Sequence, residues 1–484
     1  MLGVIESIKT RAERDPLAPA FFNGMRIVTY ADVFGGIGRV ANFLSKRGVK
    51  PGTKVFLNVG DADIRIIVTL ACLHSAIVPF VLREIGDLKD EVDHDLVIAT
   101  AQPADPKLKN DIVLDNALFA SGCDGVVLPE EPRRAESDLL FVSTTTGTTG
   151  RRKLIADLYG IHRIRNEEQE KAASRRVESH DRCLATVGDI SRYGLWMTLQ
   201  NLRAGATTVR GPADNVECLK IVNLVGVNHI STTPDTASSL MDTMDGIGAR
   251  CPSVRAIRLS GSLVPPALVA RLEKHFAATI AIGYGTTEAG RITSGEVSSA
   301  TFEPGFVGAP HPEIEVVGAG TPSDPQPVVI VNRNTTYSPF YAAGVITPVP
   351  AVPYTLPDLG YMKNGNLYLV GRSDEVFNAD GNKVAFSVIE NAIRGLAGVK
   401  DVGIVSGTAV EEPLGLLVAV AGTDQLNLDV VTERVWRTAQ ANTARRHIRV
   451  FRVATVARNS FGKVDRQGVA QAYREQLGGS STVG

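Results

Sequence analysis

The segment Leu139–Lys153 reads LLFVSTTTGTTGRRK, and it sets the expectations for the rest of the chain. Leu139–Ser143 is a short apolar run, typical of a buried strand, and a Thr/Gly-rich loop follows it directly. The glycines let backbone N–H groups turn into one concavity, the hydroxyls add donors, and Lys153 adds a positive charge. We therefore predict a phosphate-binding loop, although a Thr/Gly run taken alone is more often a solvated loop. No GxxxxGK[ST] string occurs, so this is not the P-loop of GTPases.

Apolar, β-rich runs alternate with amphipathic stretches on both sides of this segment. The predicted strands include Val55–Val59, Leu96–Ile98, Cys183–Val187, His229–Thr232, Ala256–Leu259 and Thr279–Ile282. The predicted helices include Ala31–Arg47, Ile64–His74 and Pro265–Phe276. This alternation favours an α/β fold with doubly wound parallel sheets.

The composition of the sequence changes twice toward its C-terminal end. After about Gly290, proline and glycine recur among short strands, which predicts a β-rich subdomain. After Gly371 a turn-rich segment leads into a helix and two strands, typical of a small α+β domain. We expect a large N-terminal domain, residues 1–371, and a small mobile domain, residues 372–484.

Composition excludes several classes of protein. The 51 basic and 52 acidic residues give a net charge of -1, which argues against nucleic acid or a membrane surface as the main partner. The five cysteines occur singly, as in a reduced cytoplasmic protein. The longest apolar stretch, Ile66–Leu82, is broken by His74 and Pro79 and is too short to span a membrane. We expect a soluble, cytoplasmic protein; a homodimer is left open.

Three further strings carry candidate functional residues. GYGTTEA at 283–289 follows a predicted strand and does not fit the dinucleotide fingerprint GxGxxG. LPDLG occupies 356–360, and GRSDE occupies 371–375. Near the end of the chain, 459–466 reads NSFGKVDR. Each string alone would be explained by an ordinary surface turn or a solvated side chain.

In this order, however, the strings resemble the motifs of adenylate-forming enzymes, the superfamily of acyl- and aryl-CoA synthetases, adenylation domains and luciferases. The loop is similar to the family signature TSGTTGxPKG, and a CoA ligase is the most similar type. The residues that fall into the register of that signature are Thr145, Thr146, Gly147, Thr148, Thr149, Gly150 and Lys153. Arg152, Leu154, Leu356 and Pro357 depart from the family pattern.

The resemblance implies a role for each matching residue. Tyr284 would pack beside adenine, Thr287 would contact the α-phosphate, and Glu288 would ligate Mg²⁺, for which a lone carboxylate suffices when ATP supplies the other oxygens. Asp358 would accept hydrogen bonds from both ribose hydroxyls, and Arg372 would hold the ribose.

The resemblance also assigns three residues of the small domain. Lys463 would be the catalytic lysine that bridges the carboxylate and the α-phosphate. Asp374 would be the hinge about which the small domain swings, and Gly381 would then reach the thiol channel. The implied activity is that of an ATP-dependent acid–thiol ligase, which uses ATP, Mg²⁺ and coenzyme A. No general base is needed, because the acid is already ionised.

Two alternative functions remain open at this point. The chain could load a carrier protein's phosphopantetheine arm, or it could bind nucleotide without turnover, as the departures from the pattern suggest. The segment from Val431 to Val469 contains nine Arg or Lys and only two acidic residues. These basic residues either attract coenzyme A or an acidic carrier protein, or they form a solvated face.

The sequence does not identify the acid. Ser191 stands where many relatives have a histidine, and we place the next residue, Arg192, on the surface rather than opposite a second carboxylate. His162, His229 and His447 have no partner pattern, so we expect them to be structural.

Overall fold

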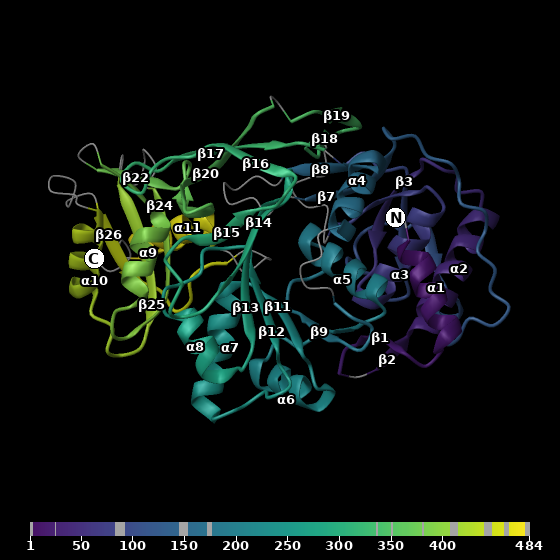
Figure 1. The fold of residues 1–484 in the computed structure, drawn as a ribbon, viewed down its shortest axis with the longest axis horizontal. Coiled ribbons are helices and arrows are strands. Elements are labelled where there is room, and N and C mark those ends of the chain that lie inside the picture. Colours follow the sequence, from purple (N-terminus) through teal and green to yellow (C-terminus); the bar gives the residue numbers. More distant parts are fainter. Residues whose placement is uncertain are drawn as a thin grey trace.

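The computed structural model describes residues 3–24, 26–82, 92–144, 153–171, 177–334, 337–349, 352–379, 382–406, 415–439, 448–458 and 464–479. Its strands form four sheets, of thirteen, eight, three and two strands. Figure 1 shows the N-terminal elements at one end of the molecule and the C-terminal elements at the other.

The eight-stranded sheet has the order β19-β18-β8-β7-β4-β3-β5-β6, and its inner pairs β7–β4, β4–β3, β3–β5 and β5–β6 are parallel. Its strands are β3 (Lys54–Asn58), β4 (Val78–Phe80), β5 (Leu96–Thr100), β6 (Ile112–Leu114), β7 (Leu139–Thr144), β8 (Leu154–Leu158), β18 (Phe340–Ala342) and β19 (Val345–Thr347). The nearby helices are α1 (Val4–Arg14), α2 (Tyr30–Lys46), α3 (Ala62–His74), the short η2 (Asn116–Phe119) and α4 (Tyr159–Lys171).

The thirteen-stranded sheet has the order β16-β17-β20-β21-β15-β14-β13-β12-β11-β9-β10-β1-β2. Its parallel part contains β1 (Pro19–Phe22), β9 (Arg182–Ala185), β10 (Thr207–Val209), β11 (His229–Thr232), β12 (Ala256–Ser260) and β13 (Thr279–Thr286), with β2 (Ile27–Thr29) antiparallel at the edge. Its helices are α5 (Arg192–Ala204), α6 (Asn215–Val225), α7 (Pro234–Ile247) and α8 (Leu268–His275).

Beyond β13 the pairing becomes antiparallel. This part contains β14 (Gly290–Val297), β15 (Phe306–Pro310), β16 (Ile314–Gly318), β17 (Gln326–Asn332), β20 (Tyr354–Lys363) and β21 (Asn366–Arg372). The proline- and glycine-rich composition after residue 290 therefore belongs to a β-rich part of the same sheet.

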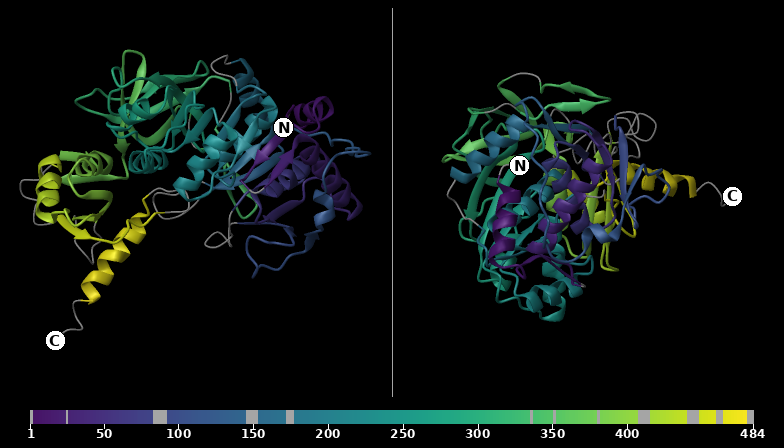
Figure 2. Two further views of the ribbon diagram at one scale, coloured as in Figure 1. Left: turned by 90° about the horizontal axis from the view of Figure 1, so that it is seen from below. Right: turned by 90° about the vertical axis from the view of Figure 1, so that its right-hand side faces the viewer.

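The C-terminal elements build a separate unit. They are β22 (Val376–Ala379), β23 (Asn382–Ala385), α9 (Phe386–Arg394), β24 (Val399–Ser406), β25 (Leu416–Gly422), α10 (Leu428–Ala439), β26 (Ile448–Arg452) and α11 (Arg466–Gly479). Two apolar clusters made only of residues from 377 onward form its core. The left view of Figure 2 shows this unit at the opposite end from the N-terminal helices.

Local sequence explains why the helices begin where they do. Thr29 and Asp32 form a reciprocal capping box at the start of α2, and the Ser191 hydroxyl accepts the N–H of Gly194 at the start of α5. The α5 helix ends at Gly205, whose positive φ of 78° suits a residue without a Cβ.

The predicted α/β fold class is confirmed. Each strand and helix predicted above is present, with ends shifted by a few residues. The apolar stretch Ile66–Leu82 contains most of α3 and all of β4, and no helix among the described residues is long and apolar enough to cross a membrane. The boundary at 371/372 and the mobility of the small domain remain predictions.

Candidate functional site

A cavity of about 1250 Å³ lies where the large unit meets the small one. Its walls come from β12, β13, β14, β20 and α5 of the large unit, and from α9, Val464 and Arg466 of the small unit. Six sequence-predicted site residues line it, namely Lys153, Tyr284, Thr287, Glu288, Asp358 and Arg372. The structure thus brings together side chains spread over more than 200 positions (372 − 153 = 219).

Tyr284, Asp358 and Arg372 form one polar cluster on this wall. The Tyr284 hydroxyl donates a hydrogen bond of 2.6 Å to Oδ2 of Asp358. Asp358 lies directly opposite Arg372 in the β20–β21 ladder. Burial raises the pKa of Tyr284 well above its ordinary value, and the negative charge of Asp358 raises it further, so the phenol stays neutral and donates.

Asp358 lies in a strand and not in an ordinary surface turn. LPDLG lies within β20, where Leu356 is 1% exposed and packs into the core. A leucine in place of the usual threonine gives this segment an apolar side chain to bury, and antiparallel pairing with β21 satisfies its backbone. The Asp358 carboxylate still faces the cavity.

Arg372 also contacts the predicted hinge residue. Its Nε and Nη2 atoms each donate to a different oxygen of Asp374 at 2.8 Å, a bidentate ion pair. This pair lies where the chain leaves β21 for the small unit.

Glu288 lies between the ends of β13 and β14, in a segment held by its backbone. The Glu288 carbonyl accepts hydrogen bonds of 2.9 Å from Arg165 Nη2 and from the N–H of Ser338. Arg165 also donates from Nη1 to the Ser338 hydroxyl at 2.9 Å. These contacts leave the Glu288 carboxylate to line the cavity.

A magnesium ion brought in by a nucleotide fits this arrangement. Throughout the described ranges, no group of three or more His, Cys, Asp or Glu is placed to hold a metal by itself. Mg²⁺ bound to phosphates needs only one or two carboxylates, and Glu288, beside the hydroxyl-bearing Thr286 and Thr287 in the cavity wall, would supply one.

Several predicted residues lie outside the described residues. These are Thr145, Thr146, Gly147, Thr148, Thr149, Gly150, Gly381, His447 and Lys463. The neighbours of the loop are described: Thr144 ends β7 in the cavity wall, and Lys153 places its Nζ atom 5.2 Å from the centre of the Phe340 ring.

Arg192 is not on the surface, so that expectation is wrong. Its side chain is 15% exposed and forms an ion pair with Asp157 of β8, which is fully buried. Burial raises the pKa of Asp157, and the guanidinium groups of Arg192 and Arg165 lower it in part. Arg192 follows the N-cap of α5, so the helix start turns it toward the cavity.

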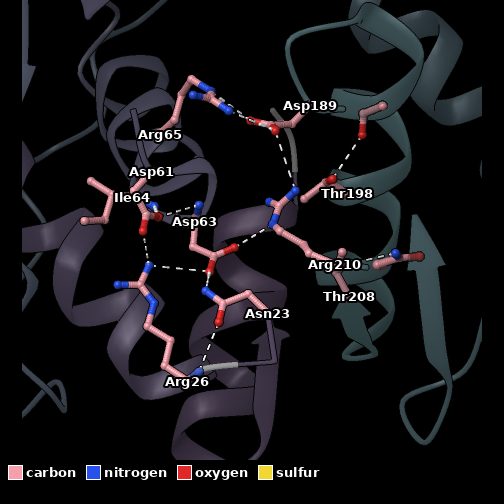
Figure 3. Close-up of polar contacts among 12 residues, drawn as sticks. Asn23, Arg26, Asp61, Asp63, Ile64, Arg65, Asp189, Thr198, Thr208 and Arg210 are labelled. Carbon is pink, nitrogen blue, oxygen red and sulfur yellow. Dashed lines mark hydrogen bonds and ion pairs between the residues drawn. The ribbon is translucent and has the colours of Figure 1, made fainter. Parts of the chain in front are cut away.

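A second buried charge network holds the segment just before α5 (Figure 3). Arg65 donates to both oxygens of Asp189, at 3.0 Å and 3.2 Å, and Arg210 donates to Asp63 at 2.6 Å. Arg210 also approaches Asp189 at 3.5 Å, which links the two pairs. The network joins α3 to β10 and fixes Asp189, three residues before Arg192.

His162 and His229 are described, and their structural role stays a prediction; His162 also lines the cavity. His162 lies 6.1 Å from Phe141, ring centre to ring centre, and burial lowers its pKa to about 3, so it is neutral. His229 lies 3.3 Å from a buried oxygen of Asp181.

Sequence reasoning missed Arg165, Ser338 and Arg466. Arg466 lines the cavity and pairs with Glu375 at 2.9 Å and Glu390 at 2.8 Å. A signal existed for Arg466, because it is the last residue of the GKxxR-like string. Arg165 and Ser338 contact each other although they lie 173 positions apart in the sequence, and no motif contains both.

Comparison with known proteins identifies the family of the chain. The family model described as AMP-binding enzyme matches residues 8–329, about two thirds of the chain. A fatty acid–[acyl-carrier-protein] ligase, MmaC of Mycobacterium marinum, is 25% identical, and the match covers 98% of this chain and 99% of that protein. A 3-hydroxybenzoate–CoA ligase of an Aromatoleum species is also 25% identical, over 83% of each chain.

Solved structures share the fold. The o-succinylbenzoate CoA synthetase MenE of Bacillus subtilis, in complex with an acyl-adenylate, is 18% identical with a TM-score of 0.76 over 95% of this chain and 97% of that one. ATP-bound MatB of Rhodopseudomonas palustris is 17% identical with a TM-score of 0.75 over 98% and 99%. The chain therefore belongs to the AMP-binding enzyme family and is an adenylate-forming ligase.

Proposed function

We propose that this ligase activates a carboxylic acid as an acyl-AMP at the expense of ATP and then transfers the acyl group to the thiol of coenzyme A. The observation that carries the proposal is the Tyr284–Asp358 hydrogen bond beside Arg372, in the same cavity wall as Glu288. These groups suit a nucleotide, with sugar and base at one end and phosphates at the other.

Nucleotide binding follows from the chemistry of these side chains. A carboxylate has about four acceptor positions, so Asp358 can accept the ribose hydroxyls in addition to the Tyr284 phenol. The Arg372 guanidinium holds the same sugar, and the Tyr284 ring packs beside the base. The loop at 145–150 and Lys153 hold the phosphates, and Mg²⁺ held by Glu288 and the phosphates would offset their negative charge.

In the first half-reaction an oxygen of the ionised acid attacks the α-phosphorus. A P–O bond forms, and the bond to the β-phosphate breaks with release of pyrophosphate. Lys463 would stabilise the charge that accumulates between the two anions, a fixed-charge effect of about 2–4 kcal/mol. In the second half-reaction the thiol sulfur bonds to the acyl carbon, AMP leaves with the C–O electron pair, and the thiol proton passes to solvent.

A change of domain position would separate the two steps. We propose that the small domain, residues 372–484, turns about Asp374, which withdraws Lys463 and presents Gly381 to the thiol. The bidentate Arg372–Asp374 pair lies at this point of the chain.

A carrier protein is the second candidate acceptor. The full-length similarity to an acyl-carrier-protein ligase favours it, whereas the 3-hydroxybenzoate relative is a CoA ligase. Both acceptors present the same phosphopantetheine thiol, so the site chemistry is shared.

The test is pyrophosphate release over a panel of carboxylic acids, followed by free CoA and a phosphopantetheinylated carrier protein as competing acceptors. Asp358→Ala should abolish most of the release, while Asp424→Ala, at a fully exposed position, serves as the matched control. Pyrophosphate release followed by formation of acyl-CoA supports the proposal. Formation of the acylated carrier protein alone would mean that the carrier protein, and not CoA, is the acceptor. ATP binding without release by any acid would favour the non-catalytic alternative.

A further inference from the structure

The end of the cavity away from the nucleotide residues is rich in hydrogen-bond donors. Arg258 and Ser260 point from alternate positions of β12 to the same face of the sheet, and both line the cavity. Arg258 pairs with Ala281 and Ser260 with Gly283 in the β12–β13 ladder. Arg258 therefore lies about 7 Å deeper than Ser260, measured along the strand away from Tyr284.

Arg258 has no carboxylate partner of its own. Among the described residues, no Asp or Glu oxygen lies within 4.0 Å of its guanidinium nitrogens in any ion pair. Glu296 lies at the same level of the sheet, opposite Ala281 on β14, and also lines the cavity, but it is exposed and one strand further away. The positive charge of Arg258 at the cavity wall is therefore not engaged in a direct ion pair with a described carboxylate.

Two more donors on α5 face the same region. The Tyr193 hydroxyl is buried close to Arg258 and Ser260, and within the described part of the chain it makes no hydrogen bond of good geometry. Nη1 of Arg192 is likewise buried without an acceptor there, although its Nη2 contacts Asp157. A buried donor without an acceptor is unfavourable, and a ligand carrying acceptors would recover that loss.

Apolar side chains also line the cavity. Phe141, Leu195, Trp196 and Leu199 line it, and Tyr193 stacks against Trp196 with ring centres 6.1 Å apart. A ligand that fits this part of the cavity has an apolar body and an anionic group at its far end.

We propose that the acid is a dicarboxylic acid: one carboxylate is activated, and the second binds Arg258, with Tyr193 as an additional donor. Arg258 is then a specificity-determining residue, because a monocarboxylic acid would leave its charge and these donors unpaired. The inference rests on the proposed function, since it identifies the substrate class of the same site.

The charge of Arg258 also acts on a buried histidine nearby. His311 is buried behind the same strands, with Nε2 3.4 Å from the Ser294 hydroxyl. Burial, together with the charges of Arg291 and Arg258, lowers the pKa of His311 to about 3. His311 therefore stays neutral and does not add to the charge that meets the second carboxylate.

The experiment compares matched pairs of acids in the pyrophosphate-release assay. Each dicarboxylic acid, saturated or aromatic, is paired with the monocarboxylic acid of the same skeleton and with its own monomethyl ester. The wild-type chain should prefer the diacid. Arg258→Gln should lower kcat/KM for the diacid by about 30-fold or more, mainly through KM, and change the monoacid by less than about 3-fold.

Two further variants separate charge from structure. Arg258→Lys should recover part of the diacid preference because it keeps the cation. Arg333 is an exposed arginine that pairs with Glu315 outside the cavity, so Arg333→Gln should change kcat/KM for neither the diacid nor the monoacid. Calorimetric binding of the same diacids to the wild-type chain and to Arg258→Gln gives a readout that does not need turnover.

The outcomes distinguish the two proposals. Release with monoacids at equal or higher kcat/KM, unaffected by Arg258→Gln, overturns the diacid inference and leaves the ligase intact. Diacid binding that depends on Arg258 without any release supports diacid recognition and overturns the proposed ligase activity. If the chain shows neither pyrophosphate release nor Arg258-dependent diacid binding, both proposals are overturned.

Discussion

Tyr284 and Asp358, separated by 74 residues, are joined by a 2.6 Å hydrogen bond from the phenol to the carboxylate. Their strands, β13 and β20, are not neighbours, because β14, β15 and β21 lie between them in the sheet. The bond therefore connects two distant points of one sheet across its face. It brings the predicted adenine-binding and ribose-binding residues into a single cluster.

Replacing Asp358 by alanine should weaken nucleotide binding more than it slows the chemical step. The change removes the acceptor for the ribose hydroxyls, and hydrogen bonds to a charged group contribute about 1.5–3 kcal/mol. We expect the KM for ATP to rise about 10- to 100-fold, measured by pyrophosphate release at saturating acid. Tyr284→Phe keeps the ring and the carboxylate and should have a smaller effect. An unchanged KM for ATP in Asp358→Ala would contradict the assigned role.

Replacing Lys463 by alanine should separate the two half-reactions. Adenylation should fall by about 10²-fold or more, because the positive charge between the two anions is lost. Thiol transfer from a supplied acyl-adenylate should be nearly unchanged. Lys400→Ala, an exposed lysine of the same small unit, provides the control. Equal loss in both halves would show that Lys463 acts in some other way, for example in folding.

The order of motifs predicted much of the fold and several of the residues that line the cavity, for an identifiable reason. Tyr284, Glu288, Asp358 and Arg372 lie on strands or next to their ends, where a short string of sequence fixes both residue and position. The alternation of apolar runs with helical patterns likewise predicts the strands around these residues.

Residues that act through tertiary contacts could not be found in this way. Arg165 holds the Glu288 carbonyl from a helix 123 residues earlier. Arg192 was misplaced because a lone arginine after a loop usually lies on the surface, and its partner Asp157 is 35 residues away on β8. Pairing between elements decides such positions, and one sequence carries no pattern for it.

Stability should fall in mild acid because two histidines are held in their neutral form. Burial lowers the pKa of both His162 and His311 to about 3, whereas an unfolded histidine titrates near 6.5. Between these values the unfolded chain binds more protons than the folded chain, so the free energy of unfolding decreases as the pH falls from about 6.5 toward 3. By pH 5 the loss is about 2 kcal/mol for each histidine.

Urea unfolding at pH 7 and pH 5 measures this loss. His162→Gln should reduce the difference between the two pH values by about 2 kcal/mol, whatever its stability at pH 7. The exposed His180→Gln should show the wild-type difference. If His162→Gln loses as much as the wild type between the two pH values, His162 does not titrate as its burial requires.

Arg466 should be the charged side chain on which the small unit depends most. Its guanidinium binds Glu375 and Glu390 and lies 5.1 Å above the Phe386 ring. Glu390 is 6% exposed, so removing the arginine leaves a buried carboxylate without its cation. Arg466→Met should lower the free energy of unfolding of the small unit by about 3–5 kcal/mol.

Trp436, which packs against the core of the small unit, allows its unfolding in urea to be followed by fluorescence. Arg437→Met is the control, because that side chain is 73% exposed and its ion pair with Glu433 should contribute less than about 1 kcal/mol. The double variant Arg466→Met with Glu390→Gln should recover part of the loss, since it removes the stranded charge as well. A single variant as stable as Arg437→Met would mean that water or another cation replaces the guanidinium, and Arg466 would then have no structural role.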